Sequence, residues 1–370
     1  MPSVDAGFAA SVTPLDTPPI SAYATYAAYL QDSNQDETKI ANKHYEAYLQ
    51  KLQGTATGKI IVITGANQGL GMIFAVAAAH LGAKKVILLN RRGSGDYAES
   101  EIKSAGAKVV RISCDLSSFA NTRAAAAAVL KDPDVKAFGI DVLCLNAGIM
   151  AVAEAATMDG YEVQMQVNHL SHFLLAKLLM EPLEKAAERT GEARIVTQTS
   201  GARGPPFVSG LAARNLEKYD GKLGSLGGNQ RSMVPPSGEW KRYGQTKLAN
   251  YMFCAAFSQR FPDSKVKAMS GNPGVSISNL QRNAHKEGNG MRNFDLWMAR
   301  KMSHSNMDAT LPSIVAAFSP DAKSGDIYNP RGGEWGPPSE GRKKEKVAWD
   351  PVQQELLWTK SEAAVGEKFL

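Results

Sequence analysis

From Lys59 onward, short apolar runs alternate with longer stretches that are able to form helices. The runs read IIVITG, KVILLN, KVVRISCD, DVLCLNAG, ARIVTQTS and KVKAMSGNPG. Continuous Val, Ile and Leu runs are typical of strands that are buried on both faces of a sheet. Their alternation with helices predicts an α/β fold, with one doubly wound parallel sheet flanked by helices.

The first part of the chain has a different pattern. A Pro-rich lead (PLDTPPI) and a Tyr-rich stretch (SAYATYAAYL) precede a segment whose apolar residues have helical spacing. These apolar residues are Ile40, Tyr45, Tyr48, Leu49 and Leu52. We therefore predict an N-terminal helical, partly flexible extension over residues 1–57 and one domain over 58–370. The extension either packs on this domain or contacts a second subunit.

Composition excludes several classes of protein. No run approaches the roughly 18 to 20 apolar residues of a transmembrane helix, and the acidic N-terminus is unlike a secretory or transit peptide. We therefore expect a soluble, cytoplasmic protein. The three cysteines lack metal-ligand spacing and are interpreted as core residues. The net charge is +6, but the basic residues are scattered, and the GRKKEK run is interpreted as a solvated loop rather than a nucleic-acid site.

A glycine-rich turn follows the first predicted strand, in the sequence TGANQGLG. Glycines permit tight turning and close approach, so that backbone N–H groups and a helix N-terminus can face a pyrophosphate. The spacing is GxxxGxG rather than GxGxxG, and the turn alone is a weak signal. The candidate pyrophosphate-binding residues are Gly65, Asn67, Gln68, Gly69, Leu70 and Gly71.

The ends of the next three strands indicate the rest of the ligand. Asn90, Arg91 and Arg92 stand where an acidic residue would bind the ribose 2′-hydroxyl of NAD, and guanidinium groups there favour a 2′-phosphate. The predicted cofactor is therefore NADPH or NADP⁺. Further candidate cofactor-binding residues follow the third and fourth strands. They are Asp115 and Leu116 near the adenine, and Asn146, Ala147 and Gly148 beside the ribose.

The sequence RYGQTKLAN places Tyr243 and Lys247 four residues apart, on one face of a predicted helix. A nearby ammonium favours the phenolate, so we expect Lys247 to lower the pKa of Tyr243. Tyr243 then acts as a general acid toward a carbonyl that receives hydride, or as a base in the reverse reaction. The hydroxyl of Ser200, at the end of the fifth predicted strand, polarises the same oxygen.

These motifs occur in an order that resembles the short-chain dehydrogenase/reductase family, over the chain from about Lys59 to the C-terminus. The stretch VNHLSHFLLAKLL is similar to the retinol-dehydrogenase-like and protochlorophyllide-reductase-like branch. The resemblance implies a Rossmann-type fold, Asn168 as the fourth catalytic residue, and Pro273 and Gly274 beside the cofactor. It also implies a homodimer or tetramer. His169 and His172 are interpreted as packing or second-sphere residues because no third metal ligand is evident.

The sequence departs from the family at two positions. Leu145 replaces an Asn before NAG, and Gln68 stands where some NADPH-preferring members have a basic residue. The predicted preference for NADPH therefore rests on Arg91 and Arg92.

Two variable segments predict the substrate side. An insertion over 203–240 is rich in Gly and Pro, which predicts a loop with at most a short helix. A second stretch, about 276–305, is predicted to form a lid. Its apolar residues fit core packing as well as they fit a lid. They are Met291, Phe294, Leu296, Trp297, Met298 and Met302.

The sequence leaves three functions open. The first is NADPH-dependent hydride transfer to or from the carbonyl or alcohol of a bulky apolar substrate that is retinoid-, steroid- or aldehyde-like. The second is a light-dependent reductase of the protochlorophyllide type, and the third is a non-catalytic dinucleotide-binding scaffold. Tyr243, Lys247, Ser200 and Asn168 together favour the first, because a scaffold does not need an acid-base tyrosine.

Overall fold

The computed structural model describes residues 40–91, 96–276, 293–339 and 345–370. Several predictions lie outside these residues. They concern the first helix of the extension, Arg92, most of the GRKKEK run and residues 277–292 of the lid segment.

A seven-stranded sheet forms the centre of the fold, and all of its neighbouring strands pair in parallel. The strand order is β3-β2-β1-β4-β5-β6-β7. The strands are β1 (Ile60–Thr64), β2 (Lys85–Asn90), β3 (Lys108–Ser113), β4 (Val142–Leu145), β5 (Ala193–Gln198), β6 (Val266–Gly271) and β7 (Ile327–Tyr328). This confirms the predicted doubly wound sheet, with its reversal of strand order between β1 and β4.

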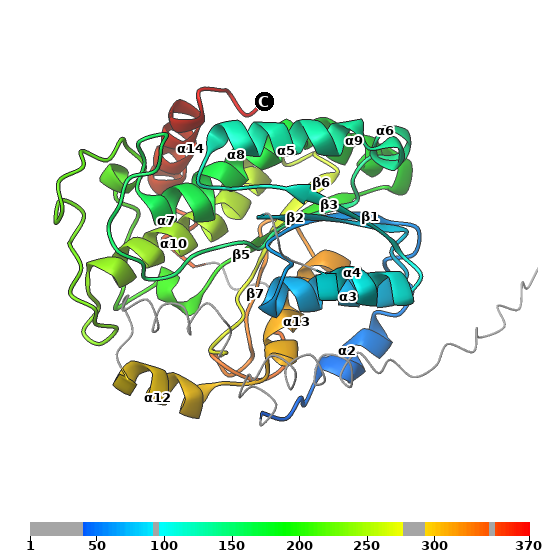
Figure 1. The fold of residues 1–370 in the computed structure, drawn as a ribbon, viewed down its shortest axis with the longest axis horizontal. Helices are drawn as coiled ribbons and strands as arrows, with labels where there is room; N and C mark the ends of the chain where they lie inside the picture. The colour runs from blue at the N-terminus through cyan, green and yellow to red at the C-terminus, as the bar shows by residue number, and fades with distance from the viewer. Residues whose placement is uncertain (1–39, 92–95, 277–292, 340–344) are drawn as a thin grey trace, which may run out of the picture.

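Helices cover both faces of the sheet (Figure 1). On one face lie α5 (Phe119–Lys131), α6 (Pro133–Phe138), α8 (Ser171–Leu178), α9 (Met180–Thr190), α10 (Gly238–Arg260) and α14 (Pro351–Val365). On the other lie α2 (Tyr45–Lys51), α3 (Gly69–His80), α4 (Asp96–Ser104) and α13 (Asn306–Phe318). Ile60 and Val62 of β1 face the first group, whereas Ile61 and Ile63 face the second, as alternation along a strand requires.

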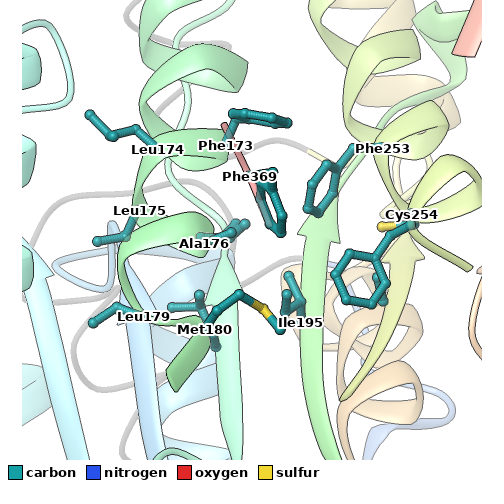
Figure 2. Close-up of a cluster of buried hydrophobic side chains, with 14 of the residues drawn as sticks. Phe173, Leu174, Leu175, Ala176, Leu179, Met180, Ile195, Phe253, Cys254 and Phe369 are labelled. Carbon is teal, nitrogen blue, oxygen red and sulfur yellow. The ribbon is translucent and has the colours of Figure 1, made fainter. Parts of the chain in front are cut away.

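An aromatic cluster closes the face that α10 and α14 cover. Figure 2 shows Phe173, Phe253 and Phe369 turned toward one another above the sheet. The ring of Phe369 lies 4.9 Å from that of Phe173 and 5.0 Å from that of Trp358, measured between centroids. These contacts fix α8, α10 and α14 relative to one another.

The end of the predicted extension is packed on the domain. Tyr45 and Leu49 of α2 are 1% and 0% exposed and belong to the core beneath α13. The Asp308 carboxylate, in the first turn of α13, accepts hydrogen bonds from the backbone N–H groups of Lys43, His44 and Tyr45, each at 2.9 Å. Residues 43–56 are therefore part of this compact unit.

The insertion between β5 and α10 is mostly irregular. It contains two short 3₁₀ turns, η3 (Gly201–Arg203) and η4 (Ala213–Asn215), before α10 begins at Gly238. In the lid segment, the described part includes α12 (Asn293–Met302), on which Trp297 and Met302 are exposed.

A short helix α7 (Val163–Met165) and a π-helical turn η2 (Gln166–Leu170) precede α8.

Candidate active site

The glycine turn between β1 and α3 is shaped for close backbone approach. Gly65 and Gly69 have φ angles of +70° and +57°, in the left-handed region that favours glycine. A Cβ at Gly71 would lie 2.3 Å from the amide nitrogen of Asn146 and from the carbonyl oxygen of Gly65. The Asn146 amide also donates to the carbonyls of Thr64 (3.0 Å) and Gly65 (3.1 Å). The NAG segment is thus docked against the turn.

The N-terminus of α3 provides backbone N–H groups at this turn. Asn67, Gln68, Gly69 and Leu70 are half-buried, with Gln68 at the residue that precedes the helix. The positive end of a helix dipole and its unpaired N–H groups attract an anion. The structure therefore brings the predicted glycine-turn residues together in an arrangement that fits a pyrophosphate.

The ends of β2 and β3 hold the next predicted residues. The side-chain oxygen of Asn90 accepts from the Ala66 N–H at 2.7 Å, and the side chain of Arg91 is exposed just beyond it. Asp115 is half-buried and accepts from the N–H and the hydroxyl of Ser117. Leu116 is buried. These positions line the side of the sheet that lies next to the glycine turn.

The four predicted catalytic residues come from three elements. Tyr243 and Lys247 lie one turn apart on α10, Ser200 follows β5, and Asn168 lies in the π-helical turn η2. The Lys247 ammonium is 5.5 Å from the centre of the Tyr243 ring and donates to the carbonyl of Gln198 at 3.1 Å. The Tyr243 phenol is hydrogen-bonded to the Ser200 side chain.

Gly148 is the point where two of these side chains, Asn168 and Lys247, meet. A Cβ at Gly148 would lie 3.1 Å from Asn168 Oδ1 and 3.5 Å from Lys247 Nζ. Asn168 also accepts from the N–H and donates to the carbonyl of Ile149, both at 2.8 Å. The fourth strand end, the π-helical turn and α10 therefore converge on one small volume.

Burial dominates the protonation of the central pair. It raises the pKa of Tyr243 to about 12, although the hydrogen bond from Ser200 opposes this. It also lowers the pKa of Lys247 to about 8. The expectation that Lys247 lowers the Tyr243 pKa is therefore wrong for the free protein. Removing both groups from water disfavours both charged forms, and this outweighs their mutual attraction.

The last predicted strand end, after β6, is also ordered. Pro273 and Gly274 are half-buried, and Gly274 has φ +68° with a hypothetical Cβ only 2.2 Å from the Glu334 carbonyl oxygen. The Pro273 carbonyl accepts from the His304 ring at 2.7 Å. This turn is thus held between the C-terminal loop and the residues before α13.

Comparisons with known proteins place this geometry in a family. Residues 59–212 match the short chain dehydrogenase family. Short-chain dehydrogenase/reductase prx1 from Penicillium rubens is 29% identical over 309 residues, which cover 81% of this chain and 83% of that protein. Retinol dehydrogenase 12 from Mus musculus is 32% identical over 230 residues, or 62% of this chain and 65% of the relative. Residues 59–212, which hold the glycine turn, the NAG turn, Asn168 and Ser200, therefore belong to the short-chain dehydrogenase family, and the similarity to prx1 extends beyond them.

A solved structure agrees with this assignment. An uncharacterized protein from Mycobacterium paratuberculosis superimposes with a TM-score of 0.63 at 27% identity, covering 87% of this chain and 98% of that one. The predicted resemblance to retinol dehydrogenases is confirmed. The resemblance to protochlorophyllide reductases stays a prediction. Within the described residues, no helix of this short-chain dehydrogenase is long and apolar enough to span a membrane.

Apolar side chains from several segments surround the tyrosine of this dehydrogenase. The ring of Trp240 lies edge-on to Tyr243 at 5.9 Å, and Phe207 of the insertion packs on Trp240 at 5.7 Å. Met150, after the NAG turn, and Val275, after the NPG turn, complete the cluster. The surroundings of the phenol are therefore apolar on the side of the insertion.

Sequence reasoning missed a buried charged cluster next to Tyr243. The guanidinium of Arg242 is 1% exposed and lies 3.2 Å from the Glu154 carboxylate and 3.3 Å from that of Glu162. Glu154 in turn accepts hydrogen bonds from three backbone N–H groups of the insertion, at Gly224, Leu226 and Gly228. We call Arg242, Glu154 and Glu162 the insertion anchor.

The insertion anchor joins residues that are 80 or more positions apart in the chain. No spacing rule connects such residues, so the sequence alone gave no signal for it. Burial raises the pKa of Glu162 to about 7, whereas hydrogen bonds and Arg242 hold the pKa of Glu154 below its usual value despite burial. The anchor fixes the insertion to the residue that precedes the candidate catalytic tyrosine.

Proposed function

We propose that this short-chain dehydrogenase is an NADPH-dependent oxidoreductase that transfers hydride between the nicotinamide and the carbonyl or alcohol of a bulky apolar substrate. The substrate class is a retinoid-, steroid- or aldehyde-like compound. The observation that carries the proposal is that Asn168 and Lys247 lie against Gly148, next to the glycine turn, with the Tyr243 ring 5.5 Å from the Lys247 ammonium. A buried acid and a dinucleotide cradle at one sheet edge suit carbonyl reduction.

The glycine turn fits a dinucleotide because a Cβ at Gly71 would collide with backbone and with Asn146, so the close approach is built in. The residues that would hold the cofactor are Gly65, Asn67, Gln68, Gly69, Leu70, Gly71, Arg91, Arg92, Asp115, Leu116, Asn146, Ala147, Gly148, Tyr243, Lys247, Pro273 and Gly274. Of the two arginines, Arg91 lies at the end of β2 with an exposed side chain, where a guanidinium would meet a 2′-phosphate. This supports NADPH over NADH.

When bound, the reduced nicotinamide supplies a hydride to the carbonyl carbon. Tyr243, whose pKa of about 12 keeps it protonated at neutral pH, donates its proton to the carbonyl oxygen. The Ser200 hydroxyl, already bonded to the phenol, hydrogen-bonds the same oxygen. The Lys247 ammonium, 5.5 Å from the centre of the Tyr243 ring, stabilises the negative charge that develops on the phenol.

An apolar substrate is supported by the side chains beside the phenol. Trp240, Phe207, Met150 and Val275 present carbon surface where the substrate would lie against Tyr243. Burying such surface against a ligand is favourable, at roughly 25 cal/mol per Å². A small polar carbonyl compound would gain little from it.

The test is oxidation of NADPH in darkness with a panel of retinoid, steroid, aliphatic and aromatic carbonyls, with NADH run alongside. Tyr243→Phe is expected to lower turnover by at least about a hundredfold while the protein still binds NADPH. Tyr251→Phe is the matched control, because this buried tyrosine of the same helix bonds to Trp349 at 2.9 Å and to the backbone of Glu345, neither of which is a predicted site residue. Turnover that survives in Tyr243→Phe would contradict the proposal.

The dark assay also separates the other two functions. Turnover that requires illumination and a tetrapyrrole would replace the proposal by a light-dependent reductase. Tight NADPH binding with no turnover under either condition would favour a dinucleotide-binding scaffold.

A further inference from the structure

A closed ring of hydrogen bonds surrounds Gly148, and a buried histidine is part of it. The Ala147 N–H donates to the Thr64 hydroxyl at 3.0 Å, and this hydroxyl is 3.0 Å from Nε2 of His172. Nδ1 of His172 is 3.0 Å from the carbonyl oxygen of Asn168. The Asn168 side chain bonds to both backbone groups of Ile149, which returns the ring to the NAG turn.

The partners determine the tautomer of His172. A carbonyl oxygen only accepts, so Nδ1 must carry the proton that bonds to Asn168. Nε2 then accepts from the Thr64 hydroxyl, whose oxygen accepts from Ala147. Burial lowers the pKa of His172 to about 3, and the nearby Lys247 ammonium acts in the same direction. The ring nitrogens therefore keep these fixed roles throughout the physiological pH range.

The ring connects the two halves of the site. Thr64 ends the strand that leads into the glycine turn, while Asn168 and Lys247 both lie against Gly148. We propose that His172 is a positioning residue, and this inference rests on the proposed reductase function. Through its bonds to the Asn168 carbonyl and the Thr64 hydroxyl, His172 holds the π-helical turn and the NAG turn in fixed positions next to Lys247. Its loss would displace Asn168 and Lys247 relative to Tyr243.

The neighbouring His169 shows what a merely structural histidine looks like in the same segment. It is equally buried, and its Nε2 bonds to the hydroxyl of Ser361 on α14 at 2.9 Å. Burial lowers its pKa to about 4. Among their described contacts, only His172 bonds both to a strand end of the cofactor side and to a candidate catalytic residue.

Two substitutions divide the roles of His172. In His172→Asn the amide N–H replaces the Nδ1 donor and keeps the bond to Asn168, but the Thr64 bond is lost. In His172→Gln the longer amide replaces the Nε2 acceptor for Thr64, and the Asn168 carbonyl loses its donor. His169→Gln is the matched control, since it removes a buried histidine whose partners, Ser361 and Asn250, are not among the groups nearest to Gly148.

In steady-state carbonyl reduction, His172→Gln is expected to lower kcat by about tenfold to a hundredfold with a smaller change in KM, since a small misplacement of reacting groups has that effect. In His172→Gln, the pH at which kcat falls on the alkaline side is expected to shift, because this fall reports the loss of the Lys247 proton. His172→Asn, which keeps the bond to Asn168 but loses the link to Thr64, should also lower kcat, by less than His172→Gln. His169→Gln should lose stability without a shift in the alkaline fall of kcat.

A measurement without substrate tests the same inference. With ¹⁵N-labelled histidine, NMR of the wild-type protein is expected to show His172 neutral with the proton on Nδ1 down to about pH 5, a range that burial of this kind permits. An Nε2–H tautomer, or a His172→Gln enzyme that behaves like His169→Gln, would overturn the inference. If the wild-type protein reduces no carbonyl, only the proposed function fails. The NMR measurement of the tautomer still tests the hydrogen bonds of His172.

Discussion

Replacing Phe369 by Ala removes one ring from the centre of the aromatic cluster in Figure 2. This ring is 1% exposed and lies within 5.8 Å, centroid to centroid, of Phe173, Trp358 and Phe253. A buried phenyl removes about 150 to 200 Å² from water, which at about 25 cal/mol per Å² corresponds to about 4 to 5 kcal/mol. Measured Phe→Ala costs of about 3 to 5 kcal/mol agree with this figure.

Urea denaturation followed by tryptophan fluorescence measures the effect, because Trp358 stacks on Phe253 in the same cluster. Leu370→Ala is the control, since this side chain is 65% exposed and its loss should change the free energy of unfolding by less than about 0.5 kcal/mol. A loss below about 1 kcal/mol in Phe369→Ala, or equal losses in both variants, would refute the packing described for this face.

Four further predictions concern the site and its supports. Gly71→Ala should abolish dinucleotide binding in calorimetry, whereas Gly204→Ala, with open space around it, should not. The raised pKa of Glu162 favours its protonated form in the folded state, so the wild type should lose stability as pH rises from about 4.5 to about 7. Glu162→Gln lacks this titration, and urea denaturation should show it gaining stability relative to the wild type by up to about 1 kcal/mol per pH unit. Asp308→Ala should cost about 1 to 3 kcal/mol and speed hydrogen exchange of the three amides that it binds. Carbonyl reduction should fall as pH rises through about 8, where Lys247 loses its proton; a constant rate from pH 7 to 9 would contradict this role.

The strand pattern could be predicted from sequence because most of the strands are short apolar runs, but the expectation of burial on both faces is wrong for β3, which lies at the edge of the sheet and is only partly buried. All six apolar runs became β1 to β6 in the expected order. The motif residues could be placed as well, because the carboxyl ends of parallel strands meet at one edge of a sheet. The i and i+4 spacing of Tyr243 and Lys247 was sufficient to put them on one helix face.

Other features depended on contacts that no local pattern encodes. The π-helical turn around Asn168 directs a side chain that bonds to Ile149, 19 residues earlier, and no local pattern predicts that contact. The raised pKa of Tyr243 follows from complete burial, whereas the sequence showed only that a lysine was near. The hydrogen bonds from the backbone N–H groups of residues 43–45 to the Asp308 carboxylate join residues that are more than 260 positions apart.

The insertion anchor constrains how this enzyme can be recombined with its relatives. A chimera that exchanged residues 203–240 alone would keep Arg242 but lose the backbone groups of the native insertion that bond to Glu154 and to the guanidinium. Glu154 and Arg242 would still pair with each other, but a hydrogen bond lost from a buried charged group costs about 1 to 3 kcal/mol, and the native insertion supplies several of these bonds. Loop grafts intended to alter selectivity should therefore transfer Glu154, Glu162, Arg242 and the insertion as a single cassette.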